Sequence, residues 1–501
     1  MRCDVPSHAY QSTFAPKHDW SDQYAPGAEI RDYWQATAKK YGVYEHAKFN
    51  QEAIGAEWNE DESVWDIKLK TTDGPEEIFS DKADYVLLAT GRFNHWKLPN
   101  YPGISDYKGL LRHAANWDTS FDPTGKKVAV IGNGASGIQV VPSLQKVVKQ
   151  LDHYARSRTW VAVDASGQGR TTKPQPYPEE QVQSFEDPEV YLAFRKELEN
   201  KQWKRFSSFF RNADANEDQR ERFTNVMKER LAKKPELLQD MVPDFSPNCR
   251  RLTPGPGYLE ALTEDNVAYV RTPIKRFTET GIETDDGVHR EVDAIFCATG
   301  ANNAIPIFPI EAKGRNLADI WDPDGEYGFS YTYMGLATPG FPNFGFVHGP
   351  HGSGPSGTTP HSIENQLTYF AKLLRKMSRE GIKTIEPSEK AADDFVEYSD
   401  AFFKTTVHSD NCSSWYNGSR PGGRVHGIWP GSAGHLTIVR RHPRWEDWNY
   451  EYLAENGNRL LWYLGNGWSR KETDEESDMT TYLQAGEVDL RDVHECWWNV
   501  P

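Results

Sequence analysis

The alternation of apolar and polar residues divides the first part of the chain into predicted helices and strands. Residues 28–45 carry apolar positions at helical spacing and predict an amphipathic helix, and the alternation at 63–72 predicts a strand. An apolar strand follows at 83–91 and ends in Ala-Thr-Gly. A second strand at 126–134 leads into a helix that extends to residue 150, and 151–156 returns as a strand. This order is a βαβ unit, which implies a parallel sheet.

The later part of the chain interrupts and then resumes this pattern. Residues 166–180 are rich in Gly, Pro and Thr and predict a connector, and 185–240 predict a charged helical insertion. Strand signals return at 266–274 and at 292–300, where a second Ala-Thr-Gly ends the strand. A helix is expected at 361–377, followed by a charged segment and a packed but irregular tail rich in Trp, Gly and Pro.

Composition narrows the class of protein. The 501 residues are 37% hydrophobic and 26% charged, with 17 Trp, 23 Tyr and 23 Phe, which predicts a folded globular chain of two or three domains. The net charge of −16 argues against a nucleic-acid partner, and no apolar run is long enough for a membrane span. The N-terminus resembles neither a signal nor a transit peptide, so we expect a cytoplasmic protein. Five separated cysteines without a CxxC predict neither a disulfide framework nor a metal site.

One glycine motif predicts a dinucleotide site. Gly132, Gly134 and Gly137 form a GxGxxG that includes Ser136, follows an apolar strand and opens a helix. The first glycine permits the tight turn, the second lets the backbone approach a pyrophosphate, and the third lets helix and strand pack closely. The helix N-terminus then supplies the anion site.

The end of the following strand indicates which nucleotide is bound. An NAD site would usually place an acidic residue there, but this chain has Arg156, Ser157 and Arg158. A guanidinium pairs with a 2′-phosphate, so we expect NADPH rather than NADH. The second glycine-rich stretch, Gly352–Gly357, contains Pro355 and is interpreted as a loop before a helix that faces a cofactor.

A more specific pattern lies just upstream of the GxGxxG. Tyr107, Gly109, His113, Trp117 and Asp118 follow the spacing YxGxxxHxxxWD. This closely resembles the signature of Baeyer–Villiger monooxygenases, whose first position is usually Phe. The segments at 3–11, 249–262 and 412–418 extend the likeness, which is greatest to the fungal secondary-metabolite branch.

The resemblance implies a fold, two cofactors and a reaction. The fold is an α/β flavoprotein with two Rossmann-like dinucleotide-binding domains and a helical insertion. Residues 1–124 and 296–501 would form the FAD-type domain, 125–165 and 246–295 the NADP-binding domain, and 166–245 the insertion. FAD and NADPH would insert an oxygen atom of O2 beside the carbonyl of a bulky, apolar ketone and yield an ester or lactone. The oligomeric state is left open.

The resemblance also assigns roles to single residues. Arg251 would stabilise an anionic intermediate, with Asp4 close to it and to the flavin, while Arg250 would lie nearer the nucleotide phosphate. These two adjacent assignments can exchange. His113 and Trp117 would act in the linkers between the cofactor domains.

The pattern departs from the family at the front of the chain. Family members carry a first βαβ with its own GxGxxG before the segment that starts here at Cys3-Asp4. Without it the FAD pyrophosphate site is missing, and the remaining sheet is expected to expose apolar edges. Three readings stay open: a shortened gene model of an ordinary oxygenase, a natural FAD-less enzyme for a non-redox cyclisation or isomerisation, or a non-catalytic partner subunit.

Overall fold

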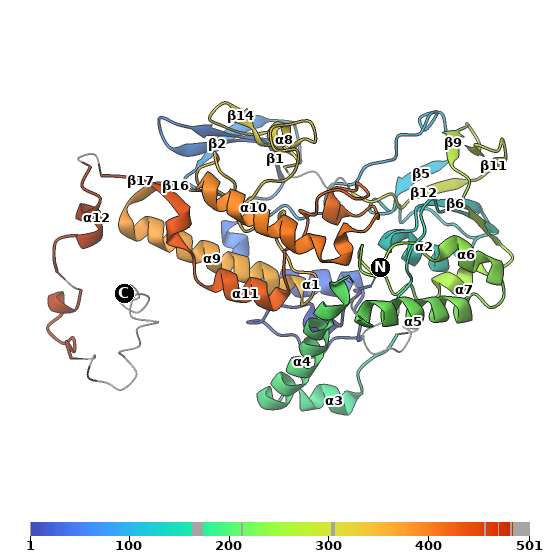
Figure 1. Cartoon of the computed structure of the whole chain (residues 1–501), viewed down its shortest axis with the longest axis horizontal. Helices are drawn as coiled ribbons and strands as arrows, with labels where there is room; N and C mark the ends of the chain where they lie inside the picture. The colour runs from blue at the N-terminus through green and yellow to red at the C-terminus, as the bar shows by residue number, and fades with distance from the viewer. Residues whose placement is uncertain are drawn as a thin grey trace.

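The structure is a computed structural model that describes residues 2–162, 174–211, 214–301, 306–454, 457–468, 470–480 and 483. Residues 166–173 of the predicted connector lie outside the described residues. Figure 1 shows one sheet with its covering helices on one side of the molecule and a second sheet above a group of long helices on the other, with further helices along the lower edge. Within the described residues, no helix combines the length and apolar character that crossing a bilayer requires.

A five-stranded parallel sheet organises the first unit. Its strand order is β5-β12-β6-β7-β8, and every neighbouring pair is parallel. The predicted βαβ is confirmed at its centre, where α2 links β6 to β7. The strands and helix are β5 (Leu110–His113), β6 (Lys127–Ile131), α2 (Ala135–Gln145), β7 (Gln150–Tyr154), β8 (Val267–Val270) and β12 (Ala294–Cys297).

Both faces of this sheet are buried, which explains why its central strands β6 and β12 are almost entirely apolar. Because side chains alternate along a strand, Val128 and Val130 of β6 enter a core with α2, whereas Ala129 and Ile131 enter a core on the opposite face. The small antiparallel sheet β11-β10-β9 covers that opposite face. Its strands are β9 (Ile274–Phe277), β10 (Gly281–Thr284) and β11 (His289–Glu291).

Two predicted helices are shorter than the pattern suggested. The helix expected to reach residue 150 ends at Gln145, where the Val147 N–H donates to the Leu144 carbonyl in the tighter 3-10 pattern of a closing turn. The helix expected at 28–45 is α1 (Gly27–Lys40), followed by a 3-10 turn at Val43–His46. Gly42 separates the two with a φ of 68°, a left-handed conformation that ends a helix.

A second five-stranded sheet, of order β14-β13-β1-β2-β3, carries the strand predicted at 63–72. Three of its strands form an antiparallel meander, and β13 adds to β1 in parallel. The strands are β1 (Gln51–Asn59), β2 (Val64–Thr71), β3 (Ile78–Ala83), β13 (Ile310–Ala312) and β14 (Arg315–Asn316), followed by α8 (Leu317–Trp321).

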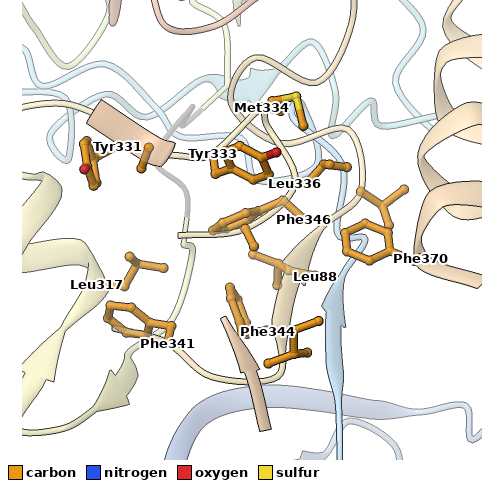
Figure 2. Packing of buried hydrophobic residues seen from close by; sticks show 14 of the residues in the cluster. Leu88, Leu317, Tyr331, Tyr333, Met334, Leu336, Phe341, Phe344, Phe346 and Phe370 are labelled. Atoms are coloured by element: carbon orange, nitrogen blue, oxygen red, sulfur yellow. The ribbon is translucent and has the colours of Figure 1, made fainter. Parts of the chain in front are cut away.

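The third sheet is a short parallel pair formed by β4 (Val86–Leu88) and β15 (Phe344–Phe346). Figure 2 shows how Phe344 and Phe346 pack with Leu88 and Phe370 in one apolar cluster. In the described part of the chain, β4 and β15 pair only with each other. Val86 and Leu87 are half-buried, so the expected apolar edge is partly covered.

Helices cover this second core. The helix predicted at 361–377 is α9 (Thr359–Glu380), which packs against α11 (Ala433–Arg441) and β16 (Ile382–Pro387). The charged segment that follows holds β16 and α10 (Glu389–Lys404). The tail is irregular and partly buried around Tyr416 and Trp429, as predicted, but regular elements follow it: α11, β17 (Trp448–Tyr452) and α12 (Leu460–Leu464).

The charged insertion is helical, as predicted. Asp187 caps its longest early helix by accepting the Glu189 N–H at 2.8 Å, with Pro188 in the first turn. Its helices are α3 (Glu179–Ser184), α4 (Pro188–Trp203), α5 (Asp214–Arg230), α6 (Leu238–Met241) and, beyond the insertion, α7 (Tyr258–Leu262).

One feature of the sheet and one disulfide were not visible in the sequence. The parallel sheet includes β5 at Leu110–His113, which precedes the boundary expected between residues 124 and 125. Strand pairing between segments far apart in sequence is not visible in a local pattern. The chain was also expected to lack disulfides, yet Cys249 and Cys412 form one across 163 residues. The fold brings two isolated cysteines together, which their spacing could not indicate.

Candidate functional site

The GxGxxG forms a tight strand–turn–helix cradle between β6 and α2. Gly132 has a φ of 103°, a backbone conformation that favours glycine. A Cβ on Gly132 would meet the Ala298 carbonyl, and a Cβ on Gly137 would collide with the Gly132 carbonyl. Ala298 is the first residue of the second Ala-Thr-Gly turn, so this repeated motif packs directly behind the cradle.

The middle glycine is different, because it faces open space. A Cβ on Gly134 would have no protein atom within 4 Å. The first hydrogen bond of the α2 ladder runs from the Ile138 N–H to the Gly134 carbonyl at 3.0 Å. The N–H groups of Ala135, Ser136 and Gly137 precede that ladder at the positive end of an 11-residue helix. The cradle therefore fits a pyrophosphate.

Basic residues gather at the end of β7, beside the cradle. Arg156 and Ser157 are exposed, and the Asn133 side chain donates to the Ser157 carbonyl at 2.6 Å. Arg250 reaches the same place and donates to the Arg158 carbonyl at 2.7 Å. Arg158 itself pairs with Asp244 at 2.7 Å, which leaves Arg156 and Arg250 as the arginines without a carboxylate partner here among the described residues. The fold thus brings the predicted 2′-phosphate residues together.

Arg251 points to a different partner. Its Nε donates to Asp4 Oδ2 at 2.8 Å, which joins the N-terminal segment to the segment after Cys249. The Asp4 carboxylate raises the pKa of Arg251 above its ordinary value, so the guanidinium stays charged. The two residues that the resemblance placed together are therefore in contact, 247 positions apart in sequence.

His113 of the signature lies beside the segments that follow the two Ala-Thr-Gly turns. His113 is buried at the end of β5 and stacks on Trp96 with ring centroids 5.5 Å apart. Trp96 forms a β-bridge with Ala301, just after the second Ala-Thr-Gly. Burial lowers the pKa of His113, opposed by the backbone of Gly300. His113 therefore lies where the segments after the two Ala-Thr-Gly turns meet. Sequence reasoning missed Trp96, for which no motif spacing gave a signal.

The remaining signature residues hold the segments of the chain that enter and leave β5. The Tyr107 hydroxyl donates to the Val292 carbonyl at 2.8 Å, and a Cβ on Gly109 would collide with the Tyr107 ring. Trp117 is 39% exposed and stacks on Phe296 of β12 at 4.4 Å. Asp118 accepts from the Ser120 hydroxyl at 2.6 Å. These contacts hold the signature segment against β12 and the nucleotide sheet.

The second glycine stretch, Gly352–Gly357, does not form an open cradle. A Cβ on Gly354 would meet the backbone of Ala433, and a Cβ on Gly357 would meet the Ala433 side chain. Its glycines therefore allow close packing against the start of α11. These protein neighbours do not support a cofactor contact at Gly354 or Gly357, and the expectation that the helix after this loop faces a cofactor stays a prediction.

Fold and site together define an α/β oxidoreductase with a dinucleotide cradle. The chain matches the model of the flavin-binding monooxygenase-like family over residues 9–245. It is 35% identical to the FAD-binding monooxygenase tazF of Aspergillus terreus, over 96% of this chain and 85% of that protein. It is 33% identical to the FAD-binding monooxygenase moxY of Dothistroma septosporum, over 99% and 79%. The chain belongs to the flavin-binding monooxygenase-like family.

The solved structures agree with this fold. A closed crystal structure of cyclohexanone monooxygenase superimposes with a TM-score of 0.76 at 23% identity, covering 90% of each chain. This likeness confirms the expected architecture, an α/β flavoprotein with two dinucleotide-binding domains. The division of this chain into residue ranges for each domain stays a prediction.

Proposed function

We propose that the chain acts in a Baeyer–Villiger-type oxygenation of a bulky ketone, with NADPH as the reductant and FAD as the second cofactor. One ketone, O2, NADPH and a proton would give one ester or lactone, NADP+ and water. The observation that carries the proposal is the Arg251–Asp4 pair, whose neighbour Arg250 donates to the Arg158 carbonyl after β7, beside the nucleotide cradle. A fixed positive charge beside a nucleotide site is what an anionic oxygen intermediate requires.

Each residue of the site has a separate role in this proposal. The N-terminus of α2, opened by Gly134, would hold the NADPH pyrophosphate, and Arg156 with Arg250 would bind the 2′-phosphate. NADPH supplies the reducing equivalents when bound. Arg251 would present its positive charge to the reacting oxygen, and its ion pair with Asp4 would fix the orientation of the guanidinium. Membership of a family whose relatives are fungal FAD-binding monooxygenases supports this assignment.

The fit for FAD is less complete than the fit for NADPH. Among the described residues, only the Gly132–Gly137 segment forms an open cradle between a strand and a helix. In this proposal Arg156 assigns that cradle to NADPH. Gly352–Gly357 is closed by Ala433. This observation favours a second candidate function: a nucleotide-binding family member that catalyses a cyclisation or isomerisation without bound flavin.

Oxygen consumption separates the two candidates. The purified chain, supplied with excess FAD, NADPH and a panel of cyclic and aromatic ketones, is expected to consume O2 and form an ester or lactone. Arg251→Ala should abolish product formation while NADPH affinity stays within about twofold, because Arg251 is not a phosphate ligand in this proposal.

A matched control uses a similar ion pair away from the site. Arg276 donates to Glu283 at 2.8 Å between β9 and β10, and Arg276→Ala should leave product formation unchanged. Substantial product from Arg251→Ala would transfer the role to Arg250. Turnover of a ketone substrate to an isomer without O2 uptake would favour the flavin-free candidate.

A further inference from the structure

The disulfide lies immediately beside the arginines of the site. Cys249 precedes Arg250 and Arg251 directly, and Cys412 begins the segment that contains Trp415 and Tyr416. Both sulfurs are buried, with 0% of Cys249 and 2% of Cys412 exposed. The crosslink therefore joins the backbone that carries both arginines to a segment 163 residues away in sequence.

Other contacts fix the backbone before Cys249, but few fix the arginines after it. The Ser246 N–H donates to Asp410 Oδ2 at 3.0 Å, and Asp410 also pairs with Arg211 at 3.2 Å. Asn248 adopts a left-handed φ of 67° and donates to the Gln219 side chain at 2.8 Å. The disulfide is thus the last covalent anchor before Arg250.

Arg250 depends on its backbone position more than Arg251 does. Arg251 has a carboxylate partner in Asp4. Arg250 has none among the described residues: its guanidinium donates to the Arg158 carbonyl and lies 5.4 Å from the Phe245 ring centroid. In the proposed nucleotide site its remaining N–H donors would bind the 2′-phosphate together with Arg156. A shift of the backbone at residue 249 would move these donors directly.

We propose that the Cys249–Cys412 disulfide is a positioning pair that sets the distance of Arg250 from the 2′-phosphate, so that the preference for NADPH over NADH depends on the crosslink. This inference rests on the proposed nucleotide site. Formation of the bond removes two electrons and two protons from the two thiols. A disulfide oxidant such as oxidised glutathione accepts them and becomes two reduced glutathione molecules.

The first test asks whether the bond exists and what it does. Mass spectrometry of the native protein, digested without reductant, is expected to show the Cys249 and Cys412 peptides linked. Calorimetry then compares NADPH and NADH binding to the wild type and to the Cys249→Ala/Cys412→Ala variant. The NADPH preference should fall by about tenfold or more, the lower end of one charge-assisted contact, while NADH affinity is unchanged.

A combined variant separates positioning from general loss of stability. If the crosslink acts through Arg250, adding Arg250→Ala to the double cysteine variant should lower the NADPH preference little further, whereas Arg250→Ala alone should lower it fully. Cys297→Ala removes another buried cysteine without touching the crosslink and should leave the preference unchanged. Should the double variant fail to fold, wild type reduced with a phosphine provides the same comparison.

Several results would overturn the proposal. Unlinked Cys249 and Cys412 peptides in the native protein would do so. An equal NADPH preference of the wild type and the Cys249→Ala/Cys412→Ala variant would do so as well. A wild type that binds both nucleotides equally would contradict the proposed nucleotide site instead. In that case amide hydrogen exchange of residues 246–252 decides: faster exchange without the crosslink supports positioning, and unchanged exchange refutes it.

Discussion

Gly134 allows the nucleotide cradle to be tested without disturbing the protein. Its φ of −76° is accessible to any L residue, and a Cβ there would have no protein atom within 4 Å. Replacing glycine by alanine at a helix N-cap is unfavourable by up to about 1 kcal/mol. The lower entropy of the unfolded chain offsets about 0.4–1 kcal/mol of this. Gly134→Ala should therefore change the free energy of unfolding by less than about 1 kcal/mol.

Nucleotide binding should respond quite differently. The new methyl group would occupy the space over the first turn of α2, where the pyrophosphate must approach the N–H groups of Ala135, Ser136 and Gly137. Losing one or two charge-assisted hydrogen bonds of about 1.5–3 kcal/mol each weakens binding by at least about tenfold. Calorimetric titration with NADP+ and thermal unfolding of the same samples measure both effects.

Gly137→Ala is the matched comparison. Its Cβ would collide with the Gly132 carbonyl, so this variant should lose stability as well as binding. The two glycines thus separate a ligand role from a packing role within one motif. If Gly134→Ala bound NADP+ as tightly as the wild type, the cradle would not be the pyrophosphate site.

Three further predictions concern selectivity, acid stability and the flavin. Arg156→Ala should weaken NADPH binding by about 1.5–3 kcal/mol in calorimetry and leave NADH binding nearly unchanged, since its exposed side chain supports no other described contact; equal affinity of the wild type for both nucleotides would contradict this assignment. Burial lowers the pKa of His153 from 6.5 to about 4, so its neutral ring contributes stability that is complete above pH 6.5 and is lost as the pH falls toward 4. Because of this ring, the free energy of unfolding should fall by about 1.4 kcal/mol for each pH unit between 6.5 and 4. Denaturant titrations at several pH values should show that the free energy of unfolding of His153→Gln depends less steeply on pH. Gel filtration should leave these 501 residues with less than one FAD per chain by visible absorbance, because only one open cradle is described; a stoichiometric yellow complex would show that the flavin needs no second cradle of this kind.

Local pattern determined the parts of the protein that depend on neighbours in sequence. The apolar strand, the GxGxxG and the following helix predict the β6–α2–β7 unit, because each glycine role arises within one turn of backbone. The same holds for the charged helical insertion. The position of Arg156 could also be predicted from sequence, because it ends the strand predicted at 151–156, which corresponds to β7.

Only the tertiary structure decided which distant segments meet. Nothing in the spacing pairs Cys249 with Cys412, places Trp96 on His113 or adds β5 to the nucleotide sheet. The second glycine motif, Gly352–Gly357, matches the same pattern as the first. Ala433 packs against the second motif, whereas no protein atom packs against Gly134 in the first. A sequence motif specifies backbone freedom, whereas the packing of remote elements decides whether a ligand or another part of the chain uses that freedom.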